Sequence, residues 1–238
     1  GPDSPVYTTG YTATLQALGV LGTHWTTTAS SAQATAPAQG TAATPPGAST
    51  AAGAGAASAS GLAPSANGGA TVFDWTALPA LVSSALAVPL GAASAYLHEA
   101  RLVDVVASGV SVATAGEGGL LLRESGRLHT AVHETRNYLH GPMEILDQQT
   151  TCLLIGDGRE VQLASDVQDY GTKAVLITTR EVESNEGLAV IRLPRASNGL
   201  AQAVLEMVVV QRLGWEVAQR RGLQVDGFRH RQSDTKVS

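Results

Sequence analysis

Two carboxylates and a histidine in the middle of the chain, Glu117, Glu124 and His140, are of types that could do chemistry. Glu117 and Glu124 are seven residues apart, so a helix would place them on one face. A carboxylate partly shielded from water has a raised pKa and can accept a proton near neutral pH, as a general base that moves a proton between adjacent carbons must. Surface pairing of Glu124 with Arg123 or Arg127 is the alternative, and spacing alone favours it.

Three histidines follow these carboxylates. His129 and His133 are four residues apart, as in a helical zinc pair, but no glutamate of a His-Glu-x-x-His motif lies between them. We therefore expect no metal. His140 is part of His-Gly-Pro, where Gly141 and Pro142 predict a rigid turn that could hold the imidazole in place. A loop histidine without a function is the alternative.

A glycine-rich segment surrounds the first carboxylate. Residues 110–114 predict a strand that leads into Ala-Gly-Glu-Gly-Gly and then a helix. Such a turn can expose backbone N–H groups to an anion. Plain connection geometry is the commoner reason for a glycine turn after a parallel strand, so the turn alone is weak evidence.

The motif spacing resembles a known family. Two motifs are similar to the signature of SIS (sugar isomerase) domain proteins related to the isomerase half of glucosamine-6-phosphate synthase. They are Gly-Glu-Gly-Gly-Leu-Leu-Leu-Arg-Glu and the later His-Gly-Pro, in which His140 lies sixteen residues after Glu124. That family reads roughly Glu-Gly-Ala-Leu-Lys-x-Lys-Glu and then His-Gly-Pro. Residues 222–226 and 234–237 resemble its closing segments, and residues 8–12 resemble the end of a first SIS domain.

The resemblance implies roles for individual residues. Glu124 matches the family's isomerisation base, and His140 matches the histidine that assists ring opening in the active site of a neighbouring subunit. Lys236 matches the lysine of a carboxyl-terminal loop that closes over the sugar, and Glu117 matches a helix carboxylate near the site. The implied protein is a dimer that binds a phosphorylated sugar and uses no cofactor.

One position departs from the family pattern. Leu121 stands where the synthase has a lysine that contacts the sugar. Without that cation Glu117 and Glu124 should repel each other, which would raise at least one pKa. The synthase is therefore disfavoured, and an isomerase, amino-sugar deaminase or deglycase of a phosphosugar fits better. A non-catalytic phosphosugar-binding regulatory module is the rival interpretation.

Composition marks residues 26–72 as a low-complexity linker, and the resemblance implies three further segments: the end of a first SIS domain (1–25), a second SIS domain (73–222) and an active-site tail (223–238). Residues 26–71 carry no charge and no aromatic ring, so we expect them to be disordered. In the family a Ser/Thr-rich loop of the first domain holds most of the phosphate, and we expect this chain to lack it. Thr8 and Thr9 are candidate substrate contacts.

The remaining sequence alternates strand-like and helix-like runs, which predicts an α/β fold: a three-layer αβα sandwich with a parallel, flavodoxin-like sheet. Asp74 could cap a helix that continues, with a proline interruption, toward Leu102. The predicted strands are 110–114, 152–155, 174–178 and 188–193, and the predicted helices lie near 117–139, 159–170 and 199–221.

Charge and cysteine content exclude several classes. A net charge of −5 and a pI near 5.6 give no basic field for nucleic acid. The one cysteine, Cys152, forms no disulfide framework and fits a reducing cytoplasm. Residues 75–97 are uncharged and long enough to cross a bilayer, but their Ala, Ser and Pro content favours an amphipathic connector. We expect a cytoplasmic homodimer.

Overall fold

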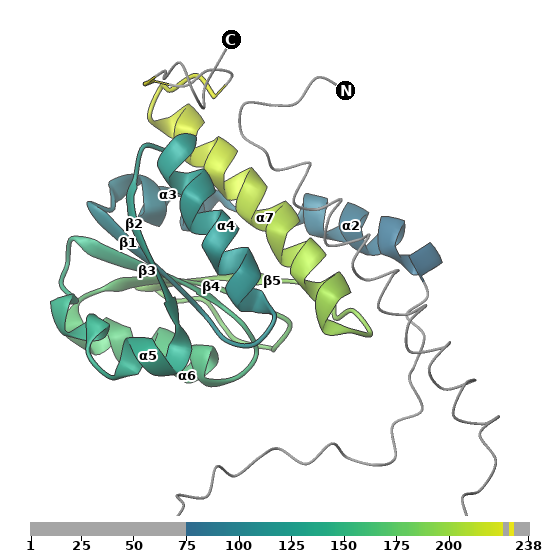
Figure 1. Ribbon diagram of the computed structural model, residues 1–238, viewed down its shortest axis with the longest axis horizontal. Coiled ribbons are helices and arrows are strands. Elements are labelled where there is room, and N and C mark those ends of the chain that lie inside the picture. The colour runs from purple at the N-terminus through teal and green to yellow at the C-terminus, as the bar shows by residue number, and fades with distance from the viewer. Residues whose placement is uncertain (1–74, 226–228, 231–238) are drawn as a thin grey trace, which may run out of the picture. The chain divides into compact units, whose positions relative to one another are not determined.

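The computed structural model describes residues 75–225 and 229–230. Their centre is a five-stranded sheet in the order β2-β1-β3-β4-β5, in which every neighbouring pair is parallel. Helices cover both faces (Figure 1), so the predicted α/β sandwich is confirmed. The strands are β1 (Leu102–Ala107), β2 (His129–Glu134), β3 (Thr150–Ile155), β4 (Lys173–Thr178) and β5 (Leu188–Arg192).

The helices divide between the two faces of the sheet. One layer holds α2 (Leu78–Ala87), α3 (Gly91–Glu99), α4 (Ser111–Glu124) and α7 (Gly199–Arg220), and the other holds α5 (Thr135–Leu139) and α6 (Arg159–Asp166). Short 3-10 segments are η1 (Trp75–Ala77), η2 (Pro142–Ile145) and η3 (Val167–Tyr170). Each helical layer buries its own apolar cluster against the sheet.

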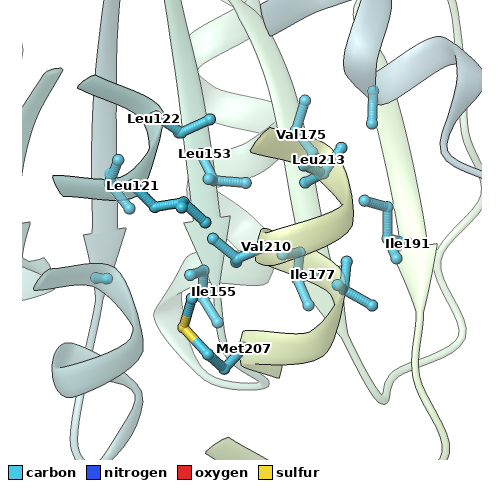
Figure 2. Close-up of a cluster of buried hydrophobic side chains, with 14 of the residues drawn as sticks. Leu121, Leu122, Leu153, Ile155, Val175, Ile177, Ile191, Met207, Val210 and Leu213 are labelled. Atoms are coloured by element: carbon cyan, nitrogen blue, oxygen red, sulfur yellow. The ribbon is translucent and has the colours of Figure 1, made fainter. Parts of the chain in front are cut away.

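The larger cluster lies between α7 and the sheet (Figure 2). Met207, Val210 and Leu213 lie on successive turns of α7, among aliphatic side chains of the strands such as Leu153 and Ile177. All five are at most 1% exposed. The predicted strands at 152–155, 174–178 and 188–193 are confirmed, as are the helical runs at 159–170 and 199–221.

The predicted strand at residues 110–114 is wrong. Those residues form the start of α4, and the first strand is β1, which ends at Ala107. Asp104 interrupts the apolar run of β1, although its side chain is fully buried. Small residues then let α4 pack closely: a Cβ on Gly118 would lie 2.8 Å from Val210 Cγ1, and one on Gly119 would lie 2.4 Å from Val132 Cγ2.

The predicted helix at 117–139 is also wrong in its second half. α4 ends at Glu124, and the chain then turns through Gly126 and Arg127, which has a positive φ of 55°. Ser125 Oγ donates a 2.8 Å hydrogen bond to the carbonyl of Leu121 at this helix end. The residues that follow form β2 and the short helix α5. His129 and His133 therefore lie on a strand, where four-residue spacing does not make a helical metal pair.

The predicted proline interruption is confirmed at Pro89. It separates α2 from α3, whose axes differ by 64°. Arg212 Nη1 donates to the carbonyls of Ala85 and Val88 at the break, at 3.1 and 2.8 Å. Within residues 75–225 no single helix is long and apolar enough to cross a membrane, and only the bent α2–α3 pair meets that criterion jointly.

Several predictions concern residues outside the described part of the chain. These are the segments 1–25 and 26–72, most of 223–238, the cap Asp74, and the candidate site residues Thr8, Thr9 and Lys236.

Candidate functional site

The two predicted carboxylates of α4 interact electrostatically. Both side chains are half-buried, Glu117 in the third-last turn of the helix and Glu124 at its last residue. Burial raises the pKa of Glu117, and the negative charge of Glu124 raises it further. The repulsion expected from the sequence is therefore present, and it makes Glu117 easier to protonate than an ordinary glutamate.

Leu121 lies between these carboxylates in sequence but faces the neighbouring helix. Its side chain is 4% exposed, and a Cβ placed on Gly214 of α7 would lie 3.3 Å from its Cγ and Cδ2 atoms. The position where the family carries a lysine is thus filled by an apolar side chain in the α4–α7 contact. Residue 121 supplies no cation to Glu117 or Glu124.

His140 lies in the opposite helical layer. It is the exposed C-cap of α5, which begins after Glu134, and the carboxylate of Glu134 accepts hydrogen bonds from the backbone N–H groups of Arg136 and Asn137 at 2.9 and 3.1 Å. The sheet separates α5 from α4 (Figure 1). The structure therefore brings Glu117 and Glu124 together but leaves His140 on the other face of the same chain.

A buried polar cluster beneath α5 had no clear signal in the sequence. Tyr138 donates a 2.8 Å hydrogen bond to Asp104 Oδ2, and its hydroxyl also lies 3.4 Å from Cys152 Sγ. His133 Nε2 lies 3.8 Å from Asp104 Oδ1. Burial raises the pKa of Asp104 and raises that of Cys152 to about 12. The cluster fixes α5 on the sheet, and Cys152 is held as a thiol.

Metal ligation has little support in the described residues. No group of three or more His, Cys, Asp or Glu side chains in residues 75–225 and 229–230 is arranged to hold a metal ion. His133 faces Asp104, whereas His129 is exposed at the start of β2. His129 lines an open hollow of about 440 Å³ at the amino-terminal edge of the sheet, beside Arg101 and Asp147.

A smaller cavity of about 150 Å³ lies at the carboxyl edge of the sheet. This is the edge where open parallel sheets bind their ligands. The polar side chains that line it come from the ends of strands and the starts of α4 and α7: Ser108, Ser111, Asp157, Thr178, Thr179, Gln202 and Glu206. We refer to it below as the carboxyl-edge pocket.

Glu206 is the unusual member of the carboxyl-edge pocket. It is 4% exposed, and Ser111 Oγ donates a 3.0 Å hydrogen bond to its Oε1. Burial raises the pKa of Glu206 to about 7, and the charges of Asp157 and Glu160 contribute in the same direction. The signal in the sequence is that Glu206 shares a helix face with Val210 and Leu213, so a carboxylate interrupts an apolar face of the predicted helix.

Asp157 behaves in the opposite way on the same edge. Burial would raise its pKa, but hydrogen bonds from Thr179 and Thr178 and the charge of Arg195 hold the pKa below its usual value. Thr178 Oγ1 donates at 2.7 Å, and Arg195 Nη2 donates at 2.9 Å. The pocket thus combines one ionised carboxylate with one that is readily protonated.

The family comparison defines the class of protein. Residues 96–211 match the SIS domain family, so the sheet and most of its helices constitute an SIS domain. Curated relatives of this chain carry the name of one aminotransferase. The chain is 31% identical over 136 residues to glutamine--fructose-6-phosphate aminotransferase [isomerizing] of Thermus thermophilus, and 29% identical over 125 residues to the Neisseria meningitidis protein of that name. These alignments cover 54% and 50% of this chain but only 22% and 20% of the relatives.

Solved structures show the same fold at low sequence identity. The C-terminal domain of glucosamine-fructose-6-phosphate aminotransferase from Francisella tularensis has a TM-score of 0.56 and 21% identity, covering 63% of this chain and 45% of that one. Tagatose-6-phosphate ketose/aldose isomerase from Escherichia coli has a TM-score of 0.51 and 16% identity, covering 61% and 43%. The Vibrio vulnificus NanR protein complexed with ManNAc-6P has a TM-score of 0.52 and 14% identity, covering 62% and 61%.

The chain therefore contains an SIS domain, which resembles part of glutamine--fructose-6-phosphate aminotransferase in sequence and phosphosugar isomerases in fold. It spans about a quarter or less of the length of the curated relatives named above.

Proposed function

We propose that this chain supplies the second SIS domain of an enzyme that interconverts aldose and ketose phosphates, or that deaminates an amino-sugar phosphate by the same chemistry. The observation that carries the proposal is the pair Glu117 and Glu124 on one helix of an SIS domain. Burial raises the pKa of Glu117, and the negative charge of Glu124 raises it further. A base that shuttles a proton between the first two sugar carbons needs a carboxylate in such a shielded position.

Glu124 is the proposed base. In its carboxylate form it removes the proton from one sugar carbon, and as the acid it returns the proton to the adjacent carbon. The enediol formed between these steps is common to the aldose and the ketose. This shuttle requires neither a metal nor an organic cofactor.

His140 is proposed to assist ring opening in a partner subunit. It is exposed and caps α5, which covers the opposite face of the sheet from α4, the helix that carries Glu124. An exposed histidine at a helix end is available to a second copy of the chain, so the proposed active form is a homodimer. Lys236 is proposed to close over the sugar, and Thr8 and Thr9 are proposed substrate contacts.

The test is solvent exchange into the sugar. Glu124→Gln in the intact protein should abolish the incorporation of solvent deuterium at the carbon next to the carbonyl of fructose 6-phosphate, followed by proton NMR. Glu183→Gln, which changes an exposed carboxylate in the loop before β5, is the control and should leave exchange unchanged. Undiminished exchange in Glu124→Gln would sink the role of that residue.

A phosphosugar sensor is the second candidate function. Leu121 favours it, because an apolar residue replaces the family's sugar-contacting lysine and lies buried against α7. A sensor would bind the sugar phosphate and release it unchanged. Calorimetry with fructose 6-phosphate, run beside a product assay, separates the two functions: binding without turnover supports the sensor, and turnover supports the enzyme.

A further inference from the structure

The carboxyl-edge pocket contains polar atoms that the described residues leave without partners. Glu206 Oε2 and Gln202 Nε2 are both buried, and neither has a hydrogen-bond partner among those residues. Both side chains line the pocket. A buried polar group without a partner costs free energy comparable to a lost hydrogen bond, so an arrangement of this kind is typical of a site that a ligand completes.

The free atoms specify the chemistry of the missing partner. The amide Nε2 of Gln202 can only donate, whereas an ionised Glu206 can only accept. A hydroxyl group both accepts and donates, so one hydroxyl can satisfy both side chains. Ser108 at the end of β1 and Thr179 after β4 add further hydroxyls to the lining.

Charge argues against an anion in this pocket. Asp157 lines it as an ionised carboxylate, and Glu206 adds a second acidic group. At the start of α4, Glu206 accepts the hydrogen bond from the side chain of Ser111, the first residue of that helix, so a phosphate placed there would face a second acidic group. The acidic side chains of Asp157 and Glu206 therefore disfavour an anionic ligand in the pocket and favour a ligand that carries an ammonium group.

Size sets a further limit. A volume of about 150 Å³ corresponds to roughly five water molecules at about 30 Å³ each. The pocket thus has room for part of a monosaccharide ring with its substituents, with the remainder at the open side. We propose that the carboxyl-edge pocket binds a hydroxyl-rich small molecule without a phosphate, with an amino sugar as its best ligand.

This site is separate from the proposed base. Glu206 and Gln202 lie in the first half of α7, at the carboxyl edge of the sheet, whereas Glu124 is the last residue of α4. α4 begins at the carboxyl edge, beside the pocket, and runs for fourteen residues, or about 20 Å, to its end. Binding in the pocket therefore does not depend on Glu124.

D-glucosamine is the probe for the experiment. Titrated into the ¹⁵N-labelled 238-residue chain at pH 7.4, where the amine still carries much of its charge, it should shift the amide resonances at the ends of β1, β3 and β4 and in the first half of α7. Glu206→Gln keeps the shape of the side chain but removes its charge, and it should weaken binding at least about tenfold. Ser108→Leu should block the pocket and abolish the shifts.

Matched variants make the result specific. Glu216→Gln makes the same chemical change on the same helix, at a side chain that lies 3.9 Å from Arg212, and should leave the affinity unchanged. Glu124→Gln should also leave it unchanged, which separates this site from the proposed isomerase function. Thermal unfolding followed by circular dichroism checks that each variant is folded.

Three results would overturn the proposal. The first is the absence of shifts with D-glucosamine in the unmodified chain. The second is that folded Glu206→Gln and folded Ser108→Leu each bind D-glucosamine with the affinity of the unmodified chain. The third is that inorganic phosphate shifts the same resonances at lower concentration than D-glucosamine, since the site would then be an anion site.

Discussion

Ser111 donates a 3.0 Å hydrogen bond to Oε1 of Glu206, although the two residues are 95 positions apart in sequence. This contact joins the start of α4 to the interior of α7 at the carboxyl edge of the sheet. It also places an ionisable group in the buried contact between these two helices. Such a group makes folding depend on pH.

The first prediction concerns that dependence. Because burial raises the pKa of Glu206 to about 7, the folded state holds a proton that the unfolded state loses near pH 4.5. The free energy of unfolding should therefore fall as pH rises from about 4.5 through 7, by roughly 3 kcal/mol in all. Glu206→Gln should remove this component, as measured by urea denaturation at pH 5 and pH 8. Glu216→Gln is the control, and a Glu206→Gln variant that keeps the full pH slope would contradict the prediction.

The second prediction concerns the close contact of α4 with β2. Gly119→Ala should destabilise the fold by about 1 to 3 kcal/mol, because its Cβ would lie 2.4 Å from Val132 Cγ2. Gly116→Ala on the same helix meets nothing within 4 Å and should stabilise the fold by about 0.5 to 1 kcal/mol. Chemical denaturation measures both, and Val132→Ala should restore part of the stability lost in Gly119→Ala. Equal effects of the two alanines would disprove the contact.

The third prediction concerns the buried cluster under α5. Tyr138→Phe leaves Asp104 Oδ2 without its 2.8 Å donor and should cost about 1 to 3 kcal/mol of unfolding free energy. Tyr170→Phe is the matched control, because Tyr170 is 54% exposed and should tolerate the change. Urea denaturation compares the two variants. A loss no larger in Tyr138→Phe than in the control would show that the hydroxyl does not hold α5.

The fourth prediction concerns the thiol. Cys152 is fully buried and its pKa is raised to about 12, so it should resist iodoacetamide at pH 8 while the protein is folded. In urea the same residue should be alkylated fully, and mass spectrometry counts the adduct because the chain has one cysteine. Rapid labelling of the native protein would mean that the β3 region opens readily.

Sequence patterns predicted the elements whose apolar residues are continuous. β3, β4 and β5 are uninterrupted runs, and α7 has a clear helical period. β1 was missed because Asp104 breaks its run, and only tertiary contacts reveal that this aspartate is buried with a tyrosine as its donor. β2 was missed because its half-buried edge position tolerates His129 and His133, and a helix seemed to continue across them.

The residues of the candidate site could also be predicted from the sequence only in part. The spacing of Glu117 and Glu124 predicted their repulsion, because both lie on one helix and helix geometry is local. Glu206 and its pocket were missed, because they depend on which strand ends and helix starts meet in space. The same is true of His140, whose position on the far face of the sheet follows from the turn at Gly126 and the strand after it.

One helix connects the two proposed sites. α7 starts at the carboxyl-edge pocket and extends for 22 residues, or about 33 Å. Directly after its last turn, Arg221 Nη1 donates to the carbonyls of Gly126 and Arg127, at 3.2 and 3.4 Å, in the turn that follows Glu124. The pocket and the turn beside the proposed base thus share one supporting helix, although they lie at its opposite ends.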